Sequence, residues 1–165
     1  MSPAREAQVG KRRLAREMAI QMLYQSEMGG SSAGEVIACF DLTDALRDSQ
    51  GDPEAHRRTV REAFEYAKKL VHGVLEERTA IDERIQLQAD NWRLERMPPV
   101  DRNILRLAAF ELFFEPETPQ LVVVDEAIEL AKRFGSEQSG RFINGLLDGL
   151  LRSHQLLPTS SGRKA

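Results

Sequence analysis

The sequence predicts an all-α protein, a single-domain bundle of about seven helices. Apolar residues recur at the helical spacings i, i+3 and i+4 along almost the whole chain. No segment alternates apolar and polar residues for long enough to predict a half-buried strand. The chain has 165 residues, of which 41% are hydrophobic and 30% charged, so it is long enough to bury a core and too apolar to stay unfolded.

The first predicted helix carries its apolar side chains on one arc and ends at two glycines, Gly29 and Gly30. The arc consists of Leu14, Ala15, Met18, Ala19, Met22 and Leu23. A brief helix is expected around residues 36–40. Within it lies Cys39, the single cysteine, which excludes an internal disulfide and is expected to be a small buried hydrophobe.

The middle of the chain predicts three further helices. Asp52 is placed to cap a long amphipathic helix in which Pro53 occupies the first position. Thr79 and Asp82 resemble a capping box that restarts a helix running to about residue 92. The proline pair at 98–99 forces a break, and the helix that follows is apolar on most of its circumference, which predicts a place at the centre of the bundle.

The end of the chain predicts two more helices. One covers about residues 121–134, with Gly135 expected in a left-handed cap. The last carries five apolar residues at helical spacing, and Gly145 and Gly149 are expected to let another helix approach closely. The predicted organisation is a flexible N-terminus (1–10), a helical domain (11–152) and a flexible C-terminal tail (153–165).

Several classes of protein are not expected. The chain has no apolar run long enough to span a bilayer and no secretory signal, so a cytoplasmic protein is predicted. The three histidines have no metal partner at ligand spacing, and no phosphate-binding glycine loop or nucleophile motif is present. We therefore expect no catalytic residues, no metal site, no cofactor and no membrane partner.

Positive charge is concentrated at the start of the chain. The total net charge is −3, but residues 1–16 hold five basic side chains and one acidic side chain (+4), so the remainder carries −7. Such an asymmetry indicates a local contact with a polyanion. The candidate cations at the entry to the first helix are Lys11, Arg12, Arg13 and Arg16.

The first helix also presents an aromatic side chain. Arg13, Glu17, Ile20 and Tyr24 align on one stripe outside the apolar arc. A cation that neutralises phosphate and an aromatic face that stacks a base suit single-stranded nucleic acid. Alternatively, the cations only solubilise a terminus and Tyr24 is a half-buried residue at the edge of the core.

The segment 134–147 is a second candidate site. Ser136 and Ser139 can cap the last helix, whose first N–H groups would face an anion. Arg141 adds a positive charge, and Phe142 lies at the edge of the apolar stripe, where its ring would be half exposed. The alternative is that these residues only cap and pack the helix.

Three blocks of sequence identify a family. "RRLAREMAIQMLYQSE", "VDRNILRLAAFEL" and "VVDEAIELAKRFGSEQSGRFINGLLDGL" resemble the NusB family of bacterial transcription antitermination factors, in order and over residues 11–152. The resemblance implies seven helices in two sub-bundles. It also implies a non-enzymatic protein that binds the single-stranded boxA element of RNA with ribosomal protein NusE, and so joins the RNA polymerase elongation complex indirectly and supports read-through of ribosomal RNA operons.

The resemblance assigns roles to individual residues. Tyr24 is implied in assembly with RNA and NusE, and Asp101 in contact with NusE. Gln138 stands where some relatives have an acidic residue, which predicts less repulsion of phosphate. With Arg141, which the residues themselves indicate, the predicted RNA-contacting set is Lys11, Arg12, Arg13, Arg16, Tyr24, Arg102, Arg106, Gln138, Arg141 and Phe142. Arg106 has a structural role as its alternative.

A different class of function stays open from the residues. The chain could instead be an RNA-independent helical adaptor or a homodimeric structural protein that uses the apolar central helix as its interface.

Overall fold

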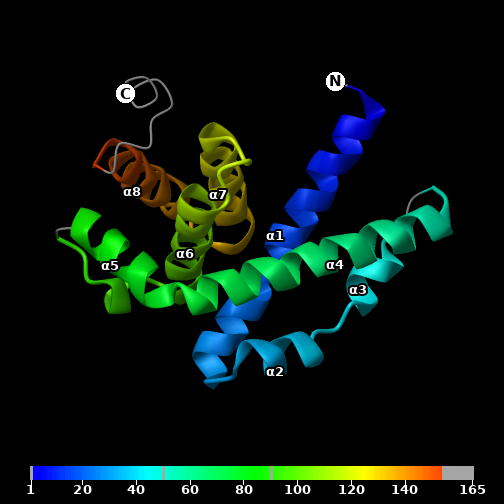
Figure 1. Ribbon diagram of the computed structural model, residues 1–165, viewed down its shortest axis with the longest axis horizontal. Helices are drawn as coiled ribbons and strands as arrows, with labels where there is room; N and C mark the ends of the chain where they lie inside the picture. The colour runs from blue at the N-terminus through cyan, green and yellow to red at the C-terminus, as the bar shows by residue number, and fades with distance from the viewer. Residues whose placement is uncertain (1, 50, 90, 154–165) are drawn as a thin grey trace. The chain divides into compact units, whose positions relative to one another are not determined.

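The computed structural model describes residues 2–49, 51–89 and 91–153, and every regular element in these ranges is helical (Figure 1). The predicted all-α class is therefore confirmed. The chain divides into two compact units, residues 1–72 and 73–165, with the boundary inside α4 (Pro53–Glu76). Two units agree with the two sub-bundles that the resemblance implies. Of the predicted tail, residues 154–165 lie outside the described ranges.

The first helix, α1 (Pro3–Gly29), begins earlier than the sequence predicts. The Ser2 side chain accepts a hydrogen bond from the Arg5 N–H at 3.3 Å, and Pro3 supplies a backbone angle suited to a first turn. Residues 3–10, which we assigned to a flexible terminus, are therefore helical. The helix ends as predicted, because Gly30 adopts φ +68° and donates its N–H to the Ser26 carbonyl.

The buried face of α1 is close to the predicted arc. Its fully buried apolar residues are Ala15, Met18, Ala19, Ile20, Met22 and Leu23. Ile20 is the exception to the prediction: it was placed on an outward stripe but is only 2% exposed. The buried arc of α1 is thus wider than the predicted arc, because it also includes Ile20. The helix packs against α2 (Ala33–Ala38).

Two short helices connect α1 to α4. In α2, Ser32 and Glu35 form a reciprocal capping box that the sequence analysis missed. The expected burial of Cys39 is wrong: α2 ends at Ala38, and Cys39 follows as an exposed C-cap. An unpredicted helix, α3 (Thr43–Arg47), precedes α4. The start of α4 is as predicted, since the Asp52 carboxylate accepts hydrogen bonds from two N–H groups of its first turn.

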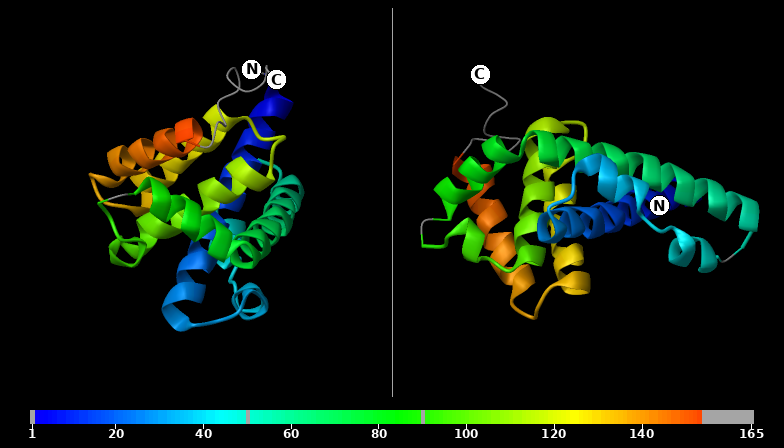
Figure 2. Two further views of the ribbon diagram at one scale, coloured as in Figure 1. Left: turned by 60° about the vertical axis from the view of Figure 1, so that its left-hand side comes forward. Right: turned by 90° about the horizontal axis from the view of Figure 1, so that it is seen from below.

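The second unit is built around α6 (Pro99–Phe114). Every residue from 101 to 112 is buried, so the predicted central position and the break before Pro99 are confirmed. Three helices of this unit pack against α6 (Figure 2). They are α5 (Arg78–Gln88), α7 (Gln120–Phe134) and α8 (Ser139–Ser153). The alternative function, a homodimeric structural protein, would use the apolar central helix as its interface. Because α6 is enclosed in this way, residues 101–112 offer no exposed apolar surface for such an interface.

Local details in the second unit correct four sequence predictions. Thr79 and Asp82 form no capping box, since the N-cap of α5 is Glu77 and its side chain makes no capping bond. Gly135 is extended (φ −98°) instead of left-handed, and a Cβ there would lie 2.5 Å from Ser139 Oγ. Gly145 was expected to let another helix approach, but it faces open space. Trp92 was expected within the helix that became α5, but it lies beyond the end of that helix.

Gly149 in α8 meets the prediction that a glycine allows close approach. A Cβ at this position would overlap the side chain of Gln88 on α5. The two helices are also joined by a hydrogen bond from Ser153 Oγ to Gln88 Oε1 at 2.6 Å. The absence of a side chain at Gly149 therefore sets how closely α5 and α8 approach.

None of the helices in the described part of the chain combines the length and the apolar character needed to cross a bilayer.

Candidate nucleic-acid interface

The four cations predicted on α1 differ in their exposure. Arg13 is exposed, whereas Arg16 is only 4% exposed and lies on the buried arc. A guanidinium removed from solvent cannot reach a phosphate without rearrangement of the helix around it. We therefore assign Arg16 a structural role, in contrast to its predicted RNA contact.

The other two cations are held by α4. Lys11 Nζ lies 2.8 Å from Glu62 Oε1, and this hydrogen bond with the attraction of the ammonium holds the pKa of Glu62 below its usual range. The guanidinium of Arg12 lies 4.0 Å from the centroid of the Tyr66 ring, and Lys69 Nζ lies 5.8 Å from the same centroid. Both Lys11 and Arg12 stay partly exposed, so α4 orients them without burying them.

Tyr66 is a residue that the sequence analysis missed. Its position lies beside the apolar stripe of α4, and its aromatic character was the only available signal. In the structure its ring contacts one cation from α1 and one from α4. Tyr24, by contrast, was predicted, and it is 40% exposed on α1. The first unit therefore presents Arg13 and Tyr24 outward, with Lys11 and Arg12 beside α4.

In the second unit, Asp101 is turned inward. It is 5% exposed, and its Oδ1 accepts a hydrogen bond from Ser139 Oγ at 2.7 Å. Ser139 Oγ in turn accepts a hydrogen bond from the Ser136 N–H at 2.9 Å. Ser139 therefore ties the α7–α8 turn to α6 instead of capping α8 as predicted. In this chain by itself, Asp101 positions that turn and does not face solvent.

The two arginines predicted on α6 also have protein partners. Arg102 Nη1 donates to the carbonyls of Leu94 and Met97 at 3.1 and 2.8 Å. Arg106 forms a two-pronged pair with Asp82, Nε to Oδ1 at 2.8 Å and Nη2 to Oδ2 at 3.0 Å. Arg102 and Arg106 are 7% and 4% exposed. Both are therefore assigned structural roles, in place of the predicted RNA contacts.

The residues after this turn remain accessible. Gln138 and Arg141 are exposed, and Phe142 is half-buried at the edge of α8. The Phe142 ring packs edge-to-face against Trp92, with centroids 5.4 Å apart and an interplanar angle of 72°. Trp92 was not among the predicted site residues, although it is 57% exposed.

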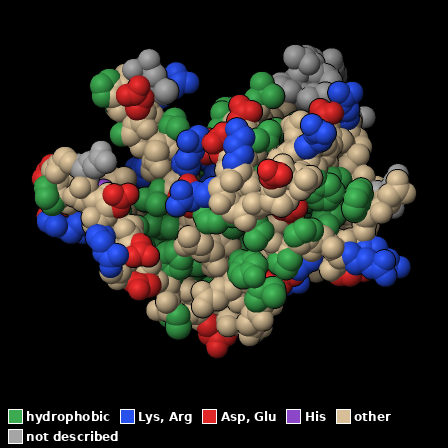
Figure 3. Space-filling model, turned by 180° about the vertical axis from the view of Figure 1, so that it is seen from behind, with side chains coloured by type: hydrophobic (Ala, Val, Ile, Leu, Met, Phe, Trp, Pro, Cys, Tyr) green, Lys and Arg blue, Asp and Glu red, His purple; other side chains and the backbone are tan. Residues whose placement is uncertain are grey.

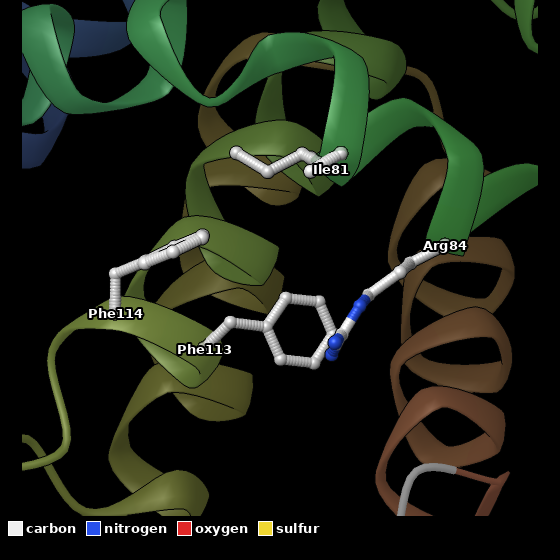
Figure 4. A pocket seen from close by; sticks show the side chains of 5 residues that line it. Ile81, Arg84, Phe113 and Phe114 are labelled. Atoms are coloured by element: carbon white, nitrogen blue, oxygen red, sulfur yellow. The ribbon is translucent and has the colours of Figure 1, made fainter.

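The remaining features of the described surface concern the distribution of charge, possible metal ligands and one cavity. On the face drawn in Figure 3, cationic and anionic side chains are interspersed. Among the described residues, no cluster of three or more His, Cys, Asp or Glu side chains could hold a metal ion. A cavity of about 190 Å³ in the second unit is lined by Ala80, Ile81, Arg84, Phe113 and Phe114 (Figure 4). The Arg84 guanidinium lies 4.4 Å from the Phe113 ring centroid, and no predicted site residue contributes to this cavity.

The predicted residues that stay at least partly exposed come from both units. Lys11, Arg12, Arg13 and Tyr24 belong to the first unit, and Gln138, Arg141 and Phe142 belong to the second. Cationic and aromatic groups accompany each other in both sets, as they do in sites for single-stranded nucleic acid.

Comparison with known protein families gives one match over most of the chain. The model of the NusB family matches residues 13–152. A transcription antitermination protein NusB from Sorangium cellulosum is 51% identical over 140 residues, covering 85% of this chain and 91% of the relative. The protein of the same description from Myxococcus xanthus is 42% identical over 140 residues, covering 85% and 94%.

Solved structures give the same result. T. maritima NusB is similar with a TM-score of 0.68 at 35% identity, covering 86% of this chain and 90% of that chain. A chain in a complex described as antitermination factors NusB and NusE with dsRNA is similar with a TM-score of 0.70 at 27% identity, covering 87% and 97%.

Proposed function

The chain belongs to the NusB family, and we propose that it is a transcription antitermination factor that binds boxA RNA together with ribosomal protein NusE. In this role it is an adaptor without catalytic activity that works in the cytoplasm, where transcription takes place. Through RNA and NusE it joins the elongating RNA polymerase and supports read-through, notably of ribosomal RNA operons. The similarity to a chain solved in a complex of NusB and NusE with dsRNA supports NusE and RNA as partners.

The observation that carries the proposal is the exposed positive charge of α1 on a chain that is otherwise acidic. Arg13 is exposed, and Lys11 and Arg12 are held at the surface by α4. Because like charges elsewhere repel a polyanion, the RNA backbone is directed to this region. Tyr24, exposed on the same helix, offers a ring to an unpaired base.

The second unit supplies a further contact. Arg141 is exposed next to Phe142, and Gln138 brings no negative charge to the turn before them. Each contact makes the next one effectively intramolecular, and NusE adds another binding surface to the assembly. Several weak contacts can therefore combine into a long-lived complex.

A mobility-shift experiment tests the proposal. The RNA strands are single-stranded boxA RNA, a scrambled strand of equal length and a duplex of the boxA sequence, each with and without NusE. We expect the boxA strand to bind more tightly than the scrambled strand and the duplex, and NusE to strengthen the preference. Equal binding of all three RNAs, or none, would refute the proposal.

Salt dependence tests whether the cations act on phosphate. Contacts from Lys11, Arg12, Arg13 and Arg141 predict a slope of about −3 for log K against log salt, from about −0.7 for each phosphate on a single strand. A flat response would remove these side chains from the mechanism.

Two arginines on α1 provide a matched pair of variants. Arg13→Ala removes an exposed cation, so the slope should fall by about 0.7 while thermal stability stays the same. Arg16→Ala removes a buried guanidinium, so it should lower thermal stability at an unchanged slope. The reverse pattern would show that the two roles are misassigned.

A further inference from the structure

We propose that Trp92 and Phe142 together form a stacking platform for one unpaired RNA base, which makes Trp92 a binding residue. The inference rests on the proposed function, because it takes RNA as the ligand. It extends the site of the second unit from α8 to the loop that follows α5.

The first observation is the exposure and geometry of the pair. Trp92 is 57% exposed, although an indole is among the largest apolar side chains. Its contact with Phe142 is edge-to-face at 72°, so the edge of one ring meets one face of the other, and the contact leaves the remaining ring faces uncovered. A ring face open to solvent is what an unpaired base stacks on, and every base has a face suited to it.

The second observation is that hydrogen bonds hold the backbone at Trp92 and at Leu94. Gln86 Nε2 donates to the Trp92 carbonyl at 2.8 Å, and the Leu94 N–H donates to Gln86 Oε1 at 2.9 Å. The Trp92 N–H donates to the Ala89 carbonyl at 2.9 Å, and the buried Arg102 binds the Leu94 carbonyl. A side chain on a fixed backbone loses less conformational entropy when a ligand binds.

The third observation is the charge beside the pair. Arg141 precedes Phe142 in α8 and is exposed, so the end of α8 that carries Phe142 also carries a long, accessible cation that can reach toward a phosphate. An aromatic face with an adjacent cation is the usual composition of a site for single-stranded nucleic acid. This charge favours RNA over an apolar protein segment as the occupant.

The experiment uses the intrinsic fluorescence of the full-length protein, because Trp92 is its only tryptophan. Titration with single-stranded boxA RNA should quench the emission and protect Trp92 from acrylamide. In a parallel assay with fluorescently labelled RNA, Trp92→Leu should weaken binding about tenfold, and Trp92→Phe should keep most of the affinity.

A control variant separates stacking from a general loss of apolar surface. Leu121 is 72% exposed at the start of α7, the end opposite the turn that leads to Phe142. Leu121→Ala should leave RNA affinity unchanged, and Phe142→Leu should lower it as Trp92→Leu does. Circular dichroism of each variant checks that the helices are intact.

The outcomes distinguish this inference from the proposed function. If labelled RNA binds but the emission is unchanged and Trp92→Leu binds equally well, the platform is refuted and the proposed function stands. If no RNA binds to the unaltered protein, with or without NusE, both are refuted. If NusE alone protects Trp92 from acrylamide and RNA does not, the platform is refuted in favour of a protein contact.

Discussion

Replacement of Ser139 by alanine tests how the α7–α8 turn is held. The Ser139 hydroxyl donates to Asp101 Oδ1 at 2.7 Å and accepts from the Ser136 N–H at 2.9 Å. Both Ser139 and Asp101 are buried, at 1% and 5% exposure. Ser139→Ala removes both bonds and leaves a buried carboxylate oxygen without this donor.

The expected loss follows from the two bonds. A hydrogen bond to a charged group contributes about 1.5–3 kcal/mol, and a neutral bond contributes about 0.5–1.5 kcal/mol. Ser139→Ala should therefore lower the free energy of unfolding by roughly 2–4 kcal/mol. For a chain of this size, that corresponds to a decrease in Tm of roughly 4–16 °C.

Trp92 fluorescence provides the assay, because the single tryptophan reports on the second unit. Guanidinium unfolding is followed for the unaltered protein, Ser139→Ala, Asp101→Ala and the double variant. Each single variant breaks the same bond. The double variant should therefore be destabilised by less than the sum of the two single variants, with a coupling energy of about 1.5–3 kcal/mol. Asp101→Asn keeps an acceptor oxygen, so its free energy of unfolding should fall by less than that of Asp101→Ala.

Ser136→Ala is the matched control. It keeps the Ser136 N–H that binds Ser139 and removes the longer contact of Ser136 Oγ with Ser139 Oγ at 3.2 Å, so its effect should stay below about 1 kcal/mol. A loss below about 1 kcal/mol for Ser139→Ala, or strict additivity in the cycle, would refute the structural role that we assign to Asp101. If Asp101→Asn instead weakened NusE binding at unchanged stability, the partner role implied by the resemblance would hold.

Three further predictions concern single contacts. Glu62→Gln should raise RNA affinity by removing a charge beside Lys11. Because Lys11 holds the pKa of Glu62 below its usual range, the carboxylate stays charged at neutral pH, so the gain in affinity should be constant there and vanish toward acidic pH; a filter-binding series over pH measures it. Arg106→Met should lower the unfolding free energy by about 3 kcal/mol in guanidinium titrations, because it leaves a partly buried carboxylate without its main partner. Gly145→Ala, facing open space, should raise Tm slightly in calorimetry, whereas Gly149→Ala should gain less or lose stability, because its methyl group displaces the Gln88 side chain that binds Ser153.

Much of the fold could be predicted because its signals are local. Three signals depend only on residues a few positions apart: the helical periodicity, the proline pair before α6 and the cap at Asp52. The structure confirms all three predictions. The burial of Arg16 could also have been predicted from the sequence. Arg16 lies at helical spacing from Ala19 and Leu23, which places it on the buried arc of α1.

The sequence by itself determined most of the helices, the family and the place where positive charge gathers. Only the tertiary structure decided which polar side chains meet solvent, because spacing defines the faces of a helix but not what covers them. α6 is covered on all sides, so Arg102 and Arg106 bind protein groups there. Trp92 and Phe142 lie far apart along the chain, and packing alone brings their rings together at the surface.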